Sequence, residues 1–311
     1  GTAADAMVAA QVVLGLVEPE SSGLGGGAFL LYYDNNKNII TTLDGRETAP
    51  LKASSSRFQK ENGQSMKFFD AVVGGLSVGT PGVPALLYEA HKKWGLINWN
   101  ELFDNGILLS ENGFSVSKKL SESIKRDKER LHSFKQTKDY FFPNGLALAH
   151  QDIKKNEPYA STLKLISNSG IEEFYEGEIA EKIADDIQSN GGFITTEDLK
   201  NYSAKESEVL TGKFNGYDIN TLNLPSYGSI TIQMIQIMDQ LKIESERDWN
   251  LKISSAVEEA YKNRPYQKDP DSLKSILSID RAKEIALDIE NSNSEIAFND
   301  LTKKFDMADI V

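Results

Sequence analysis

The feature that most constrains the fold is an apolar segment near the start of the chain that is followed directly by a run of glycines. Residues 3–16 are apolar on nearly every face of a helix, which predicts a helix covered on most sides by other parts of the protein. Residues 21–27, Ser-Ser-Gly-Leu-Gly-Gly-Gly, come next, and the aliphatic and aromatic residues 28–33 follow them. The order is therefore helix, glycine-rich segment, strand.

This order argues against a nucleotide-binding loop. Phosphate-binding glycines follow a strand and open a helix, and in the common P-loop a Lys-Ser or Lys-Thr pair comes after them. Here the glycines follow a helix and open a strand, and no such pair is present. We expect instead that the glycines let two layers approach closely or supply positive φ angles in a tight connection.

Turn residues divide the rest of the chain into strands and helices. A polar cluster at 34–38 predicts a hairpin with strands near 28–33 and 39–44, and Asn215-Gly216 predicts a second one with strands at 206–214 and 217–223. A second passage rich in glycine and proline, residues 74–84, precedes a helix that ends at Gly95. Further helices are expected near 99–111, 117–133, 158–168, 176–190, 228–242 and 250–263, with a short capped helix starting at 195–198.

Strands near both ends with helices between them predict an α+β architecture. The strands are few for the length, so we expect at least one sheet to be completed from outside this chain. The 311 residues suit one large domain or two smaller ones, and we expect a single domain over 1–311 with a loosely held polar tail from about 285 to 311. The chain starts without Met or a signal segment and stops at Val311 without a closing element, which is typical of a chain cut at both ends.

Composition excludes several classes of function. The chain carries 34 Lys and Arg against 46 Asp and Glu, a net charge of −12, which argues against nucleic acid or an anionic membrane as a partner. It contains no cysteine and three scattered histidines, and no apolar run is long enough to cross a membrane. The sequence thus predicts no metal site, no cofactor, no nucleic-acid partner and no membrane span.

The residues do not supply a complete catalytic set. No Gly-x-Ser-x-Gly motif is present, and no pair of carboxylates can be assigned to one site, so we assign no catalytic residue to this chain. Arg46 remains as a candidate binding residue because a guanidinium at the end of a strand can hold a carboxylate through two parallel hydrogen bonds. The alternative is an internal ion pair between Arg46 and Asp44 or Glu47, and local spacing does not decide between the two.

Several segments together resemble one known family. They are Ala4–Ala6, Leu14–Phe29, Leu43–Pro50, Gly74–Gly82, Phe174–Gly177, Gly191-Gly192 with Thr196–Leu199, Tyr217, and Glu259–Tyr261 with Asp269–Asp271. In this order they resemble the large part of the γ-glutamyltranspeptidases, also called glutathione hydrolases.

The resemblance implies an N-terminal-nucleophile hydrolase with a four-layer αββα sandwich that a small subunit completes. Members of the family are made as a precursor, a zymogen that cuts itself autocatalytically into two subunits, and the nucleophile is the N-terminal Thr of the small one. The α-amino group of that Thr can serve as the base, so no histidine is needed. Since no Thr-Thr-His-like start occurs before Val311, we interpret the chain as the large subunit of a heterodimer.

The resemblance also implies a reaction. The enzyme would cleave the γ-glutamyl amide bond of glutathione or a related γ-glutamyl compound and pass the glutamyl group to water or to an amino acid or peptide. Arg46 would bind the α-carboxylate of the glutamyl group. Alternatives are a member of the family that acts on poly-γ-glutamate or an acylase-type member, and a non-catalytic binding homologue. Family members are commonly periplasmic or secreted.

Overall fold

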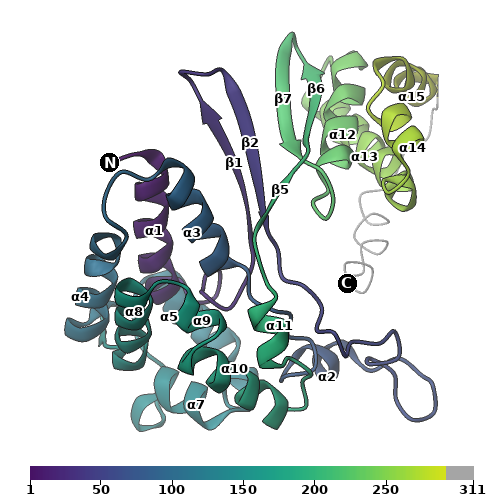
Figure 1. Ribbon diagram of the computed structural model, residues 1–311. Helices are drawn as coiled ribbons and strands as arrows, with labels where there is room; N and C mark the ends of the chain where they lie inside the picture. Colours follow the sequence, from purple (N-terminus) through teal and green to yellow (C-terminus); the bar gives the residue numbers. More distant parts are fainter. Residues whose placement is uncertain (292–311) are drawn as a thin grey trace. The chain divides into compact units, whose positions relative to one another are not determined.

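The computed structural model describes residues 1–291, which form parts of two compact units (Figure 1). The first unit comprises Gly1–Phe29 and Asp44–Lys205, and the second comprises Leu30–Leu43 and the chain from Glu206 onward. The single domain expected over 1–311 stays a prediction. Of the expected tail, residues 285–291 belong to the last helix, and 292–311 lie outside the described residues.

The first unit is built mainly of helices, with two very short strands. Its elements are α1 (Ala3–Val17), α2 (Phe68–Val72), α3 (Val83–Trp94), η1 (Trp99–Phe103), α4 (Asp104–Asn112), β3 (Phe114–Ser115), α5 (Lys118–Arg126), α6 (Lys128–Leu131), α7 (Lys135–Phe141), η2 (Pro143–Gly145), β4 (Ile153–Lys154), α8 (Glu157–Ser169), α9 (Glu172–Tyr175), α10 (Glu178–Ser189) and α11 (Thr196–Lys200). β3 and β4 pair antiparallel, and the helices α3, α4 and α8 lie near α1 (Figure 1).

Helix α1 begins after Thr2, which caps its first turn together with Asp5. The side chain of Thr2 accepts a hydrogen bond from the Asp5 backbone N–H, and the Asp5 carboxylate accepts one in return from the Thr2 backbone N–H at 2.6 Å. Positions 4, 8, 12 and 16 are buried on one face, whereas Ala6, Ala10 and Leu14 on the opposite face are exposed in this chain. The prediction of cover on most sides is therefore wrong for the chain taken alone.

An apolar cluster holds the C-terminal end of α1 against the segments that follow α4. Its buried members are Leu16, Phe114, Val116, Leu120, Ile124, Phe142 and Leu148. Burying a large aliphatic or aromatic side chain contributes about 1.5–3 kcal/mol relative to leaving it in water. The cluster therefore fixes the end of α1 from which the glycine-rich segment leaves.

The second unit combines strands with a helical bundle. Its elements are β1 (Ala28–Asp34), β2 (Ile39–Gly45), β5 (Lys205–Ser207), β6 (Val209–Phe214), β7 (Tyr217–Leu222), α12 (Gly228–Gln240), α13 (Glu246–Lys262), η3 (Arg264–Tyr266), α14 (Pro270–Ile276) and α15 (Ile279–Asn291). The first two residues of β1, the last two of β2 and the first of β5 are assigned to the first unit. β1, β2 and β5 form one sheet in that order, and β6 and β7 form another. An apolar cluster joins α12, α13 and α15; its buried members are Ile237, Met238, Leu241, Ala256, Ala282, Ile285 and Ala286.

Both predicted hairpins are confirmed. The β6–β7 ladder closes with Phe214 opposite Tyr217, and the two turn residues Asn215 and Gly216 both have positive φ, at 47° and 79°. A two-residue turn of this kind matches the twist of the strands, and asparagine and glycine adopt it most readily. The β1–β2 hairpin turns through residues 35–38, where the Asp34 carboxylate accepts hydrogen bonds from the backbone N–H groups of Asn36 and Lys37.

Most of the predicted helices are present, with two kinds of difference. Two segments that were expected to be continuous are interrupted: the helix at 117–133 breaks at Asp127 between α5 and α6, and the strand at 206–214 breaks at Glu208 between β5 and β6. The helices α2, α7, α9, α14 and α15 and the short strands β3 and β4 were not predicted. None of the helices within residues 1–291 is both long and apolar enough to cross a membrane.

Candidate functional site

Arg46 lies immediately after β2, where the chain leaves the sheet. Its backbone N–H donates to Oδ1 of Asp44 at 2.8 Å, and its carbonyl oxygen accepts a hydrogen bond from the hydroxyl of Tyr202 at 2.8 Å. The main chain of Arg46 is thus held on both its donor and its acceptor side. This fixes where the long side chain starts, although most of the side chain is in solvent.

The guanidinium of Arg46 pairs with its neighbour in sequence. Nη1 lies 2.7 Å from Oε2 of Glu47, and the Arg46 side chain remains 55% exposed. Of the two internal partners considered from the sequence, Glu47 takes the side chain and Asp44 takes the backbone N–H. A guanidinium has five N–H donors, so the pair with Glu47 leaves others free to bind a second carboxylate.

Glycines from both glycine-rich passages pack against residues 45–48. A Cβ atom added to Gly27 would lie 2.8 Å from the Glu47 backbone nitrogen, and one added to Gly79 would lie 2.9 Å from the Glu47 Cβ. A Cβ on Gly82 would collide with the carbonyl oxygen of Gly45. Side chains at these three positions would push the neighbouring main chain away, so the glycines are what allows this close packing.

Hydrogen bonds join the same segments. The carbonyl oxygen of Gly26 accepts from the backbone N–H groups of Gly82 at 2.9 Å and Val83 at 3.1 Å, and Thr48 and Thr80 exchange a pair of backbone hydrogen bonds. None of the glycines at 23–27 has a positive φ. Of the two roles expected for them, close approach is therefore confirmed and tight turning is not needed.

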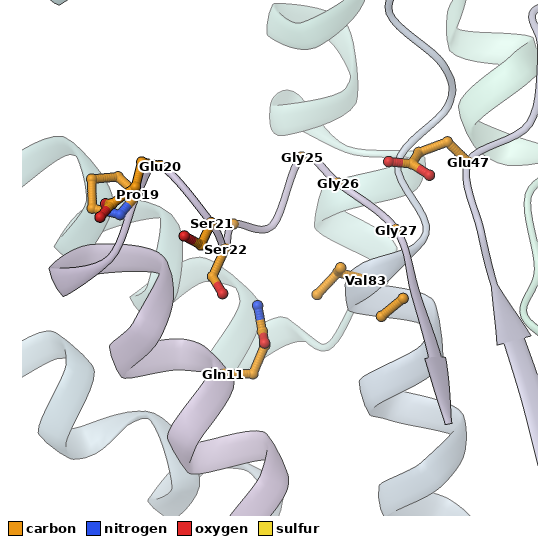
Figure 2. A pocket seen from close by; sticks show the side chains of 12 residues that line it. Gln11, Pro19, Glu20, Ser21, Ser22, Gly25, Gly26, Gly27, Glu47 and Val83 are labelled. Atoms are coloured by element: carbon orange, nitrogen blue, oxygen red, sulfur yellow. The ribbon is translucent and has the colours of Figure 1, made fainter. Parts of the chain in front are cut away.

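A cavity of about 560 Å³ lies along the glycine-rich segment. Figure 2 shows Gln11 of α1 on one side, Val83 at the start of α3 on another, and the carboxylate of Glu47 beyond Gly26 and Gly27. The residues that line it are Gln11, Pro19–Gly23, Gly25–Ala28, Glu47 and Val83. Glu47 thus lies at the cavity and also contacts the Arg46 guanidinium.

Asp198 anchors the chain just after the site residue. Its side chain is only 7% exposed, and Oδ1 accepts a hydrogen bond from the Leu51 backbone N–H at 2.6 Å. Oδ2 accepts from the backbone N–H of Thr195 at 2.8 Å and from its hydroxyl at 2.6 Å, which forms the predicted cap of α11. Burial raises the pKa of Asp198. The hydrogen bonds from Thr195 and Leu51 and the charge of Lys52 together lower it by more than burial raises it, so the pKa lies below its ordinary value.

This carboxylate should make the stability of the protein sensitive to acid. Because its pKa is lower in the folded state, Asp198 stabilises the fold fully above its unfolded pKa, about 3.9, and this contribution is lost as the pH falls through the folded pKa. We expect the free energy of unfolding, measured by urea denaturation between pH 6 and pH 3, to fall less steeply in Asp198→Asn than in the unchanged protein. The exposed Asp288→Asn serves as a control that keeps the original slope. Equal slopes for Asp198→Asn and the unchanged protein would contradict the role assigned to Asp198.

Sequence reasoning selected Arg46 as a candidate but missed the residues that hold the segment from Arg46 to Leu51. Tyr202 lies 156 positions away from Arg46, and Asp198 lies 147 positions from Leu51. The capping pattern at 195–198 was visible, yet a local pattern carries no information about a contact with a distant loop. Within residues 1–291, no group of three or more His, Cys, Asp or Glu side chains is arranged to hold a metal ion.

The sequence model of the γ-glutamyltranspeptidase family matches residues 1–308, nearly the whole chain. The chain belongs to the γ-glutamyltranspeptidase family. It is 37% identical over 294 residues to the glutathione hydrolase proenzyme of Bacillus subtilis strain 168, a match that covers 91% of this chain and 50% of that protein. It is 34% identical over 283 residues to the glutathione hydrolase proenzyme of Escherichia coli K12, covering 88% and 48%. The chain thus spans about half the length of these two relatives.

Solved structures of γ-glutamyltranspeptidases share the fold. The Helicobacter pylori γ-glutamyltranspeptidase matches with a TM-score of 0.88 at 31% identity, over 94% of this chain and 87% of that one. The Pseudomonas nitroreducens γ-glutamyltranspeptidase, solved as a complex with L-DON, matches with a TM-score of 0.84 at 27% identity, over 94% and 89%. These matches confirm the predicted α+β N-terminal-nucleophile hydrolase fold.

Proposed function

We propose that this chain is the large subunit of a γ-glutamyltransferase that also acts as a glutathione hydrolase. The enzyme would cleave the γ-glutamyl amide bond of glutathione or a related compound and transfer the glutamyl group to water, an amino acid or a peptide. One observation carries the proposal. The exposed guanidinium of Arg46 extends from a main chain that hydrogen bonds hold on both sides, next to the cavity, and the γ-glutamyltranspeptidase family model matches residues 1–308 of this chain.

Arg46 would bind the α-carboxylate of the γ-glutamyl group. The protein has a net charge of −12, so an anionic substrate needs a local cation to offset repulsion at the site. Arg46 supplies it, and its planar fork can bind a carboxylate through two parallel hydrogen bonds while Glu47 holds Nη1. Glu47 would then limit the rotation of the guanidinium, so that the remaining donors face the substrate.

The covalent chemistry would lie with a partner subunit from the same precursor. Its N-terminal Thr would attack the γ-glutamyl carbonyl carbon, and the α-amino group of that Thr would take the hydroxyl proton. Hydrogen-bond donors would stabilise the negative charge on the carbonyl oxygen, the amine would leave with a proton, and water or an amino acid would release the glutamyl group. The role of Arg46 is to place the carbonyl by holding the far end of the substrate.

The surface of β1 supports a partner that packs on this chain. In the described part of the chain β1 is one of the two edge strands of the β1–β2–β5 sheet, and its alternate residues Phe29, Leu31 and Tyr33 are exposed. Large apolar side chains at an exposed edge strand favour pairing with another chain. We propose that the small subunit covers this surface and completes the sheet.

Intact-mass measurement of the purified product of the complete gene tests the proposal. We expect two polypeptides, of which the second begins with Thr, together with release of p-nitroaniline from γ-glutamyl-p-nitroanilide. A single species near 34 kDa without this activity would contradict the proposal and support a non-catalytic homologue. Incubating the same enzyme with poly-γ-glutamate and measuring the shortening of the polymer separates the two substrate classes. We also propose that the enzyme is periplasmic or secreted, on the strength of the family resemblance.

A further inference from the structure

Tyr202 connects the main chain of Arg46 to Tyr175 and, through Tyr175, to the start of α3. Its hydroxyl donates a hydrogen bond to the Arg46 carbonyl oxygen at 2.8 Å, and its ring stacks on that of Tyr175 with centroids 5.7 Å apart and planes 7° apart. Offset parallel stacking is a favoured geometry for a pair of aromatic rings. The stack on Tyr175 therefore restrains the ring that carries the Tyr202 hydroxyl.

Tyr175 is itself fixed at the start of α3. The residue is 5% exposed, and its hydroxyl donates to the Pro81 carbonyl oxygen at 2.9 Å and accepts from the Ala85 backbone N–H at 3.2 Å. Gly82 lies between these two residues and packs against the carbonyl of Gly45. Two contacts thus link the start of α3 to residues 45 and 46. Gly82 packs directly against Gly45, and the stacked pair of Tyr175 and Tyr202 connects the start of α3 to the carbonyl of Arg46.

The Tyr202 hydroxyl remains a donor under all ordinary conditions. Burial raises its pKa, and the nearby carboxylates of Asp44 and Glu47 raise it further, because a phenolate there would be repelled by both. The carbonyl of Arg46 can only accept a hydrogen bond, so the direction of this bond is fixed.

We propose that Tyr202 is a positioning residue for substrate binding, which acts by holding the main chain of Arg46. The inference rests on the proposed role of Arg46. A guanidinium at the end of a four-bond stem moves several ångströms when its backbone rotates by a few tens of degrees. The hydrogen bond to the carbonyl limits that rotation, so the guanidinium keeps the direction in which it meets the substrate carboxylate.

Tyr202→Phe in the processed enzyme tests this directly, because the change removes the hydroxyl and leaves the stacked ring. Loss of one neutral hydrogen bond predicts a KM for γ-glutamyl-p-nitroanilide that rises roughly 2- to 12-fold, with kcat changed less than about twofold. Tyr159→Phe is the matched control: its hydroxyl also donates to a main-chain carbonyl, but to that of Val12 on α1 at 2.9 Å and not to that of Arg46. We expect Tyr159→Phe to keep the original KM, and thermal unfolding of both variants shows that they fold.

A double variant with Arg46→Ala separates positioning from general loosening. If Tyr202 acts through Arg46, adding Tyr202→Phe to Arg46→Ala raises KM no further. An unchanged KM in Tyr202→Phe alone, a fall in kcat without a rise in KM, or effects that multiply in the double variant would each overturn the inference. If Arg46→Ala alone leaves KM unchanged, the proposed role of Arg46 fails, and the inference about Tyr202 fails with it. The single variants therefore show which of the two ideas is wrong.

Discussion

Replacing Arg46 with alanine is expected to raise KM for γ-glutamyl substrates roughly 10- to 150-fold. A hydrogen bond to a charged group contributes about 1.5–3 kcal/mol, and each 1.4 kcal/mol corresponds to a factor of ten in binding. The effect falls on binding because the guanidinium would hold the α-carboxylate, which takes no part in bond breaking. Steady-state kinetics with γ-glutamyl-p-nitroanilide measures it directly.

Two further comparisons show whether Arg46 recognises that carboxylate. Arg46→Lys keeps the charge and loses the planar fork, so its KM should lie between those of the unchanged enzyme and Arg46→Ala. A 4-aminobutyryl anilide has the same chain as the γ-glutamyl compound without the α-carboxylate. Its kinetics should change little when Arg46 is replaced, because the lost guanidinium had no partner on this substrate.

Arg281→Ala provides the control for loss of a surface arginine. Arg281 pairs with Glu284 on α15 at 3.0 Å, as Arg46 pairs with Glu47, and its side chain is 45% exposed. We expect its KM to equal that of the unchanged enzyme. A correctly processed Arg46→Ala enzyme with unchanged KM, or one that loses activity equally on both anilides, would remove Arg46 from the substrate site.

Gly82→Ala should damage stability and substrate binding together. The backbone of Gly82, with φ −115° and ψ −19°, suits any residue, so the effect would come from crowding alone. The new methyl group would collide with the Gly45 carbonyl and with the Tyr202 hydroxyl, and neither can retreat easily. Overpacking of this kind costs about 1–3 kcal/mol. The free energy of unfolding should fall by about 2 kcal/mol, and KM should rise because residue 45 adjoins Arg46.

Gly25→Ala is the matched control for stability. A Cβ added to Gly25 meets no atom within 4 Å, so the same methyl group at this position should leave the unfolding transition where it is. Urea denaturation and thermal unfolding of the two variants measure the difference, which should be roughly 3 °C in Tm for a chain of 311 residues. If Gly82→Ala has the same Tm as Gly25→Ala and the KM of the unchanged enzyme, close packing at Gly82 does not stabilise the segment that carries Arg46.

The glycine-rich passages show what a sequence can and cannot say. The order of the first passage after a helix argued against a phosphate loop, and close approach of two layers was one of the expected reasons for its glycines. The structure shows that Gly27, Gly79 and Gly82 all pack against residues 45–48. Neither passage predicts that residues 45–48 are the packing partner. A glycine indicates that a side chain would not fit, but it does not indicate which segment lies against it.

Arg46 illustrates the same limit for a charged residue. Its position at a strand end and its two acidic neighbours were evident, and the choice between Asp44 and Glu47 as partner was open. The fold decided it: Asp44 is used by the backbone of Arg46, and Glu47 lies where the guanidinium reaches it.

The sequence alone determined the family, both hairpins, most helices, and the candidate residue Arg46. These depend on local patterns of apolar spacing, turn residues and caps, or on motifs that lie in one stretch of chain. The tertiary structure alone decided that Tyr202 and Asp198 hold the segment from Arg46 to Leu51, and that α1 exposes one of its faces in this chain. Contacts across about 150 residues depend on how the elements pack, and packing is a property of the whole chain that no local pattern contains.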